Sequence, residues 1–108
     1  MNLIKHKNNY YWGTVFHLIK DDGKAHIACH IEDDEYVYIC ELFILEELRG
    51  KGLGKELLKE AEQIGKDNNK TIALLKVEKI DKLIDYYKEA GYKQYDEDEH
   101  YIYMKKEL

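Results

Sequence analysis

A glycine-rich loop at residues 46–55 carries the residue types and spacing best suited to chemistry. Its glycines, at positions 50, 52 and 54, allow a tight turn in which several backbone N–H groups point the same way. A helix that begins just after the loop would add the positive end of its dipole. Arg49, the only arginine in the chain, can form forked bonds to phosphate oxygens, and Lys51 and Lys55 add positive charge. The loop is therefore a candidate phosphate-binding site.

Two common nucleotide-binding patterns do not fit this loop. Gly54-Lys55 is followed by Glu56, whereas a Walker loop needs a Ser or Thr hydroxyl there to hold magnesium. Leu57 stands where a dinucleotide-binding fingerprint needs its third glycine. The anion is thus expected to bind at another kind of strand-to-helix turn.

The hydrophobic pattern predicts the elements that position the loop. Residues 36–44 carry apolar groups on both faces, which is typical of a strand in the middle of a sheet covered on two sides. Apolar residues from Leu53 to Ile64 fall at helical spacing, and Gly91 is placed to end a second helix. Further strands are predicted at residues 11–20, 25–31, 71–77, 92–95 and 100–105, and the strand at 71–77 is expected to be buried and parallel to its neighbour. The order β-β-β-α-β-α-β-β describes an α+β fold.

Length and composition limit the functional classes. A chain of 108 residues with 44% hydrophobic and 36% charged residues predicts one globular domain over residues 1–108, in which residues 1–10 form a short N-terminal segment. The 22 acidic and 17 basic residues leave a net charge of -5, which argues against a nucleic-acid partner and favours a basic small molecule or protein tail. Because the sequence has no bilayer-length apolar run and no signal-peptide core, we expect a cytoplasmic protein without a membrane partner.

Two segments resemble the GNAT family of N-acetyltransferases. Residues 42–54 are similar to the acetyl-CoA signature of that family, an apolar strand followed by Arg/Gln-x-x-Gly-x-Gly/Ala. Residues 86–92 are similar to a second family element, Tyr-x-x-x-Gly-Phe/Tyr, through Tyr87, Gly91 and Tyr92. The resemblance extends over roughly residues 11–108 and implies a GNAT-like mixed central sheet with helices packed on it.

The resemblance also implies a cofactor, acetyl-CoA, and roles for the matching residues. The pantetheine arm would pair with the strand backbone at Leu42, Phe43 and Ile44, and an N–H near Ile44 would polarise the thioester oxygen. The residues implied for the pyrophosphate are Arg49, Gly50, Lys51, Gly52, Leu53, Gly54 and Lys55. Tyr87 matches the tyrosine that protonates the departing CoA thiolate, although its place on an apolar helical stripe also suits simple core packing. Tyr86, one helical step earlier, is expected to point away from it.

The sequence is less specific about the base that removes a proton from the amine. Glu41, a charged residue within an apolar strand, is the leading candidate, with water or a histidine as alternatives. Three histidines, His17, His26 and His30, would share one face of neighbouring strands, but no carboxylate or cysteine is paired with them, so no metal site is predicted.

The two cysteines, Cys29 and Cys40, lie in separate predicted strands and are expected to be packing thiols. Because the sequence indicates no Cys-His pair, the amine is expected to attack acetyl-CoA directly, without an acetyl-cysteine intermediate.

Only about ten residues precede the region of resemblance, where the family usually has a strand and two helices, so we expect most of these elements to be absent. The acceptor side is therefore expected to be open, suited to a protein tail, or to be completed by a second subunit in a homodimer. Two smaller departures are Ile80, where the family often has asparagine, and Glu46, where it usually has proline.

The resemblance implies an N-acetyltransferase that moves acetyl from acetyl-CoA to a primary amine: a small amine, a protein lysine or an N-terminus. The alternative is a non-catalytic acetyl-CoA-binding regulatory module that binds a partner protein.

Overall fold

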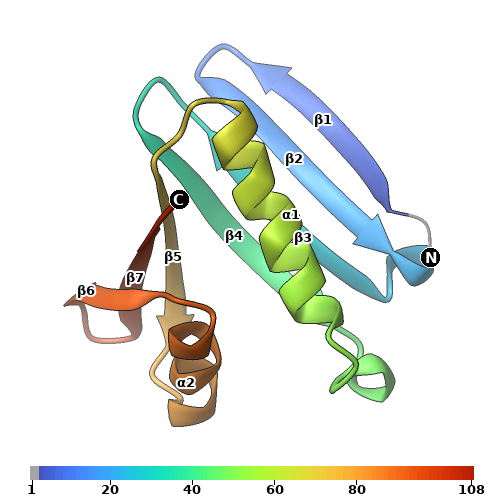
Figure 1. Cartoon of the computed structure of the whole chain (residues 1–108), viewed down its shortest axis with the longest axis vertical. Coiled ribbons are helices and arrows are strands. Elements are labelled where there is room, and N and C mark those ends of the chain that lie inside the picture. Colours follow the sequence, from blue (N-terminus) through green and yellow to red (C-terminus); the bar gives the residue numbers. More distant parts are fainter. Residues whose placement is uncertain (1–2) are drawn as a thin grey trace.

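A computed structural model describes residues 3–108 as one seven-stranded sheet with two helices (Figure 1). The elements are β1 (Ile4–Tyr10), β2 (Gly13–Lys20), β3 (Ala25–Ile31), β4 (Tyr36–Ile44), α1 (Leu53–Asp67), β5 (Ile72–Glu78), α2 (Asp81–Glu89), β6 (Lys93–Glu97) and β7 (Tyr101–Glu107). The strand order across the sheet is β1-β2-β3-β4-β5-β7-β6. The predicted α+β class is confirmed, and every predicted element is present.

The first strand, β1, is an addition to the predicted order. It pairs antiparallel with β2 along its whole length, from Ile4 opposite Ile19 to Tyr10 opposite Gly13. All seven of its residues are exposed and most are polar, so its sequence has no apolar alternation to reveal it. Lysines on an exposed edge strand commonly prevent the sheet from pairing with strands of other molecules. The N-terminal residues 4–10 are therefore part of the sheet.

The central feature of the sheet is the divergence of β4 from β5. The two strands are parallel, as predicted, but they pair only from Tyr36 opposite Ile72 to Tyr38 opposite Leu74. Beyond that point β4 continues against β3 to Ile44, while β5 continues against β7 to Glu78. Figure 1 shows the two halves of the sheet separating there, with α2 beside the far end of β5. The divergence opens a space between β4 and β5.

Helix α1 covers one face of the larger half of the sheet and forms the core with it. Its buried apolar stripe packs against β3 and β4, as Figure 1 shows. The largest fully buried side chains of this core include Leu18, Ile27, Val37 and Leu57. Within residues 3–108, neither helix is long and apolar enough to cross a membrane.

The other face of β2, β3 and β4 is less covered than predicted. His17 is exposed, His30 and Tyr38 are half-buried, and Phe43 is 42% exposed. The expectation that β4 is covered on both sides is therefore wrong, because the alternation in this strand places aromatic rings on the second face that pack against each other at the surface. We call this side of β2, β3 and β4 the second face.

A β-bulge interrupts β4 where the divergence begins. Ile39 lies opposite Cys29 and Glu41 lies opposite Ala28, so Cys40 is an extra residue without a partner on β3. A bulge of this kind bends a strand and redirects a side chain. Cys40 is exposed on the second face, and the prediction that it is a packing residue is wrong; Cys29, by contrast, is fully buried.

Candidate functional site

A cleft of about 780 Å³ lies between β4, the loop before α1, and α2. It is lined by Leu42, Phe43, Ile44, Leu48, Arg49, Gly50, Gly52, Leu53, Gly54, Lys55, Lys82, Leu83, Tyr86 and Tyr87. The structure thus brings together nearly all the residues that sequence analysis assigned to a cofactor. Of the residues assigned to the cofactor, Lys51 does not line the cleft, and neither does Glu41, the candidate base.

The loop before α1 has the backbone shape of an anion site. Gly50 and Gly52 both have positive φ angles, of 79° and 82°, which a side chain would strain. No atom lies within 4 Å of the place where a Cβ would be at either glycine, so the loop is open above them. The first helical hydrogen bond joins the Glu56 N–H to the Gly52 carbonyl at 3.1 Å. The N–H groups before Glu56 therefore have no partner inside the helix and can serve a ligand.

Three cationic side chains, those of Arg49, Lys55 and Lys82, line the cleft. The Arg49 Nε donates a hydrogen bond to the Ile44 carbonyl at 3.0 Å and so ties the loop to the end of β4. A forked contact from Arg49 to phosphate would therefore use the Nη groups. Lys82, on α2, was not predicted, because it lies on an ordinary charged helix surface and only the fold brings it to the loop. The cleft is positive although the whole chain is negative.

Two tyrosines of α2, Tyr86 and Tyr87, line the cleft with their rings perpendicular to each other and ring centroids 5.2 Å apart. Burial raises the pKa of Tyr87 to about 12, with a contribution from Tyr86, so its hydroxyl keeps its proton at neutral pH. Burial also raises the pKa of Tyr86. An added methyl group at Gly54 would collide with the Tyr86 hydroxyl, which therefore touches the start of α1. The expectation that Tyr86 points away is wrong, because the loop and α2 enclose both rings.

The end of α2 agrees with the predicted cap. Gly91 has a φ of 99°, and the Tyr92 N–H donates to the Tyr87 carbonyl at 3.0 Å. This turn directs the Tyr92 ring into the core, where its centroid lies 6.1 Å from that of Tyr87 and its hydroxyl donates to buried Glu62 at 2.9 Å. The position of Tyr87 is thus held from the protein interior.

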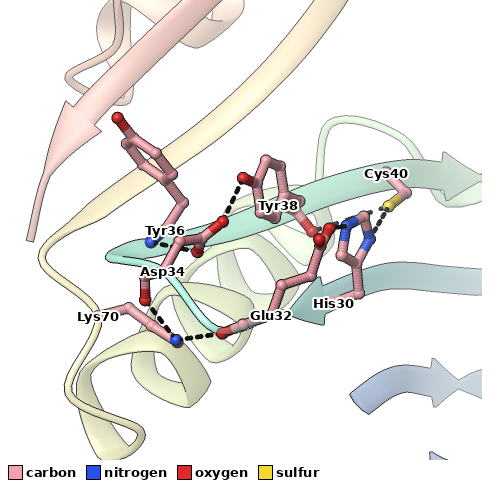
Figure 2. A network of polar contacts seen from close by, with 7 residues as sticks. All are labelled: His30, Glu32, Asp34, Tyr36, Tyr38, Cys40 and Lys70. Carbon is pink, nitrogen blue, oxygen red and sulfur yellow. Dashed lines mark hydrogen bonds and ion pairs between the residues drawn. The ribbon is translucent and has the colours of Figure 1, made fainter. Parts of the chain in front are cut away.

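A second polar group lies on the second face of the sheet (Figure 2). The two ring nitrogens of His30 have different partners: Nδ1 is 3.2 Å from the Cys40 Sγ, and Nε2 is 2.9 Å from the Glu32 Oε2. We call His30, Glu32 and Cys40 the Cys40 cluster. The expectation that no Cys-His pair is present is therefore wrong, because the sheet brings His30 and Cys40 into contact.

The cluster is not arranged as a metal site. Its cysteine and its carboxylate contact opposite ring nitrogens of His30 and so do not converge on one point. Among residues 3–108, no three His, Cys, Asp or Glu side chains are grouped to hold a metal ion. Of the other predicted histidines, His26 stacks on Phe43 with ring centroids 5.4 Å apart.

Comparison with known proteins identifies the family of this chain. The model of the acetyltransferase (GNAT) family matches residues 3–92, and the chain belongs to that family. It is 37% identical over 67 residues to YjbC of Bacillus subtilis (strain 168), a match that covers 62% of this chain and 31% of YjbC.

Solved structures show the same fold. The N-acetyltransferase PaiA from Thermoplasma acidophilum, in complex with coenzyme A, superposes with a TM-score of 0.76 at 25% identity, over 87% of this chain and 60% of PaiA. A GNAT family acetyltransferase from Elizabethkingia anophelis, with acetyl-CoA bound, has a TM-score of 0.77 at 13% identity and covers 99% of both chains. The present chain therefore spans less than two thirds of YjbC and of PaiA, and almost the whole of the third protein.

Proposed function

We propose that this protein is an N-acetyltransferase that moves an acetyl group from acetyl-CoA to a primary amine. The observation that carries the proposal is the cleft where β4 and β5 diverge, with a glycine turn and a helix N-terminus at one end and Tyr87 on its wall. Family membership supports it, as do the coenzyme A bound to PaiA and the acetyl-CoA bound to the Elizabethkingia protein.

The residues present fit the proposed cofactor. A pyrophosphate needs N–H donors and positive charge, which the Gly50 and Gly52 turn and the nearby side chains of Arg49 and Lys55 supply. The pantetheine arm is largely apolar and carries amide groups, so it needs an apolar wall and a free strand edge. Strand β4 offers both at Leu42, Phe43 and Ile44, where it is no longer paired with β5. Bound there, acetyl-CoA supplies an activated thioester.

Two of the chain's residues are proposed to move protons. Tyr87, whose raised pKa keeps it protonated, donates a proton to the departing thiolate from the cleft wall. Glu41 is exposed on the second face at the divergence of the strands and takes the proton that the incoming amine must lose. The donor and the acceptor of protons then lie on two sides of β4.

The acceptor is proposed to be a basic molecule, either a small amine or a protein lysine or N-terminus. The net charge of -5 and the exposed acidic side chains at the β3–β4 turn, Asp33, Asp34 and Glu35, favour a cationic acceptor by electrostatic attraction. The second face, with its exposed Glu41, is an accessible approach for such a molecule.

Thermal unfolding with coenzyme A, followed by a turnover assay, tests the proposal. A ligand at 100 times its dissociation constant stabilises the folded state by about 2.7 kcal/mol, so we expect coenzyme A and acetyl-CoA to raise the melting temperature. A panel of amines and lysine peptides should then release free coenzyme A. No shift at millimolar cofactor would overturn the proposal. A shift without turnover on any acceptor would favour a regulatory acetyl-CoA-binding module instead.

A further inference from the structure

A row of aromatic rings crosses the second face toward the point where β4 and β5 diverge. Tyr10 stacks on Trp12 with ring centroids 5.4 Å apart, and His30 stacks on Tyr38 at 4.7 Å. The two pairs meet at a right angle, since the Trp12 and His30 rings are nearly perpendicular, with centroids 5.6 Å apart. Tyr36 extends the row along β4, with its centroid 5.8 Å from that of Tyr38. We call Tyr10, Trp12, His30, Tyr36 and Tyr38 the aromatic row.

The aromatic row is open to solvent. Tyr10 is 52% exposed and Trp12 is 40% exposed, while Tyr36 and Tyr38 are half-buried. Helix α1 packs on the opposite face of β3 and β4 and does not cover these rings. A contiguous group of exposed aromatic side chains on a folded protein indicates a surface that binds another molecule.

The border of the row is acidic, because residues 32–35 of the β3–β4 turn are four consecutive carboxylates. The Asp34 carboxylate accepts the Tyr38 hydroxyl at 2.6 Å, and the Glu32 carboxylate is 2.9 Å from the His30 Nε2 (Figure 2). The ammonium group of Lys70 donates to the main-chain carbonyls of Glu32 and Asp34, at 2.6 Å each, and offsets only one of the four negative charges. Ring faces beside carboxylates are the surroundings that attract a cation.

Rings at the other end of the sheet already carry cations of the chain itself. The Lys76 ammonium lies 4.4 Å from the centroid of the Tyr101 ring on β7, and the Lys105 ammonium lies 5.7 Å from that of Tyr95 on β6. Among residues 3–108, no lysine or arginine lies over a ring of the aromatic row. The row is therefore left for a cation from another molecule.

The polar groups of the row favour a cation over a sugar or a nucleic acid. A sugar needs free hydrogen-bonding groups beside the rings, but the Tyr38 hydroxyl and both ring nitrogens of His30 already have partners within the protein. A nucleic acid that stacks on aromatic rings also needs positive charge for its phosphates, whereas the turn at residues 32–35 is negative. A guanidinium or ammonium group needs only ring faces and negative charge.

Strand β4 connects the aromatic row to the proposed cofactor cleft. Tyr38 is the last residue of β4 that pairs with β5, Glu41 follows on the same face, and Leu42 lines the cleft. The four strand residues from Tyr38 to Leu42 span about 13 Å. An extended segment with a cation on Tyr38 can therefore bring a lysine about four residues away to the opening of the cleft.

We propose that the aromatic row binds an arginine- or lysine-rich segment of a protein, and that a lysine about four residues from the bound cations is the acetyl acceptor; this inference rests on the proposed function. The cations of the segment lie on the rings of the row and beside the carboxylates of the β3–β4 turn. The acceptor lysine lies near Glu41, at the opening of the cleft. A small amine makes no contact with the row and is a poorer acceptor.

The fluorescence of Trp12 tests the binding step directly, because Trp12 is the only tryptophan in the chain and belongs to the row. The experiment titrates the whole chain, without cofactor, with a capped peptide in which a single lysine is flanked by arginines about four residues away. The matched peptide has citrulline, which is uncharged and of nearly the same shape, in place of each arginine. We expect a saturable change in Trp12 emission with the arginine peptide and a roughly tenfold higher dissociation constant with the citrulline peptide.

Exposed variants assign the roles of ring and charge at an unchanged melting temperature. Tyr10→Ala should weaken binding of the arginine peptide by roughly 2- to 5-fold. Tyr11→Ala is the matched control, because Tyr11 is the adjacent tyrosine but is 102% exposed and outside the row, so its loss should change nothing. Glu35→Gln should weaken binding of the arginine peptide and not of the citrulline peptide, whereas Glu99→Gln, in the exposed β6–β7 turn, should affect neither.

An acetyl-transfer assay distinguishes failure of this inference from failure of the proposed function. We expect kcat/KM for the arginine peptide to exceed that for the citrulline peptide by roughly tenfold, and Tyr10→Ala to reduce this ratio without changing the rate with a small amine. If the two peptides are acetylated equally well, the inference is overturned and the proposed function stands. If coenzyme A does not bind the original protein, the proposed function fails, and the Trp12 titration alone decides whether the row binds a basic segment.

Two other results would assign the row to a different occupant. Trp12 emission that changes with protein concentration in the absence of peptide, together with a dimer in light scattering, would show that a second copy of the chain covers the row. A response to an amino-sugar oligosaccharide but not to the arginine peptide would identify a sugar as the ligand. Either result would overturn the inference.

Discussion

The cleft and the Cys40 cluster are held together in different ways. The cleft relies on backbone: a turn with two glycines at positive φ, followed by helix N–H groups. On the second face, the Cys40 cluster relies on three side chains, held by a stacked tyrosine and a lysine-braced turn. A backbone site comes from consecutive residues, whereas a side-chain site depends on strand register. Changes to one side should therefore leave the other intact.

The largest expected effect tests the cleft wall. Tyr87→Phe removes one hydroxyl and keeps the ring, so we expect acetyl transfer to fall by roughly 10²- to 10⁴-fold while coenzyme A still raises the melting temperature. Steady-state kinetics with thermal unfolding measures both properties. Tyr95→Phe, at an exposed position of β6, is the control and should have no effect.

Tyr86→Phe sharpens this assignment, since both hydroxyls lie at the cleft. A loss with Tyr86→Phe that equals or exceeds the loss with Tyr87→Phe would transfer the proton-donor role to Tyr86. No loss with either variant would leave both rings as packing residues.

The next effect tests whether the glycine turn holds the cofactor. Gly52→Asp puts a carboxylate where the pyrophosphate is proposed to bind, so the cofactor-induced stabilisation of about 2.7 kcal/mol at 100 times the dissociation constant should disappear. Gly23→Asp is a matched control, because Gly23 also has a positive φ, of 88°, and open space around it, in the β2–β3 turn. If Gly52→Asp still binds coenzyme A as the original protein does, the pyrophosphate lies elsewhere.

A smaller effect is expected on the second face. Lys70→Met removes the ammonium group that braces the carbonyls of Glu32 and Asp34, and the free energy of unfolding should fall by about 1–3 kcal/mol in urea titrations. The shift produced by coenzyme A should not change. A weaker shift would show that the two sides of β4 are coupled.

The smallest effect concerns a turn that belongs to neither side. Hydrogen bonds from the Tyr103 hydroxyl and from the N–H groups of His100 and Tyr101 lower the pKa of Asp98 from 3.8 to about 2. A lowered pKa in the folded state stabilises the fold above about pH 4, and this contribution is lost as the pH falls through about 2. Asp98→Asn should therefore have a lower melting temperature than the original protein at neutral pH, and the difference between the two melting temperatures should shrink as the pH falls. A difference that stays constant from pH 4 to pH 2 would contradict this account.

The elements that sequence analysis anticipated share a local cause. The residues of the cleft from Leu42 to Lys55 are nearly consecutive, and the cap at Gly91 depends on one turn of chain. Strand β1 was missed because its residues are all exposed, and its pairing comes from a hairpin rather than from burial. Lys82 and Tyr86 were missed as cleft residues because α2 is brought to the loop only by the packing of the sheet.

The sequence by itself determined the α+β class, the glycine turn and the family resemblance, since helical spacing, strand alternation and glycine positions act over short stretches of chain. Only the tertiary structure decided that Cys40 meets His30. In regular pairing from Ile39 opposite Cys29, Cys40 would lie opposite Ala28, but the bulge gives that place to Glu41 and leaves Cys40 without a partner on β3. Its contact with His30, ten residues away, depends on the register of the β3–β4 hairpin, in which His30 lies opposite Tyr38, and a lysine from beyond α1 fixes the turn. None of these has a signature in residue spacing, because cross-strand geometry is set by the packing of the whole sheet.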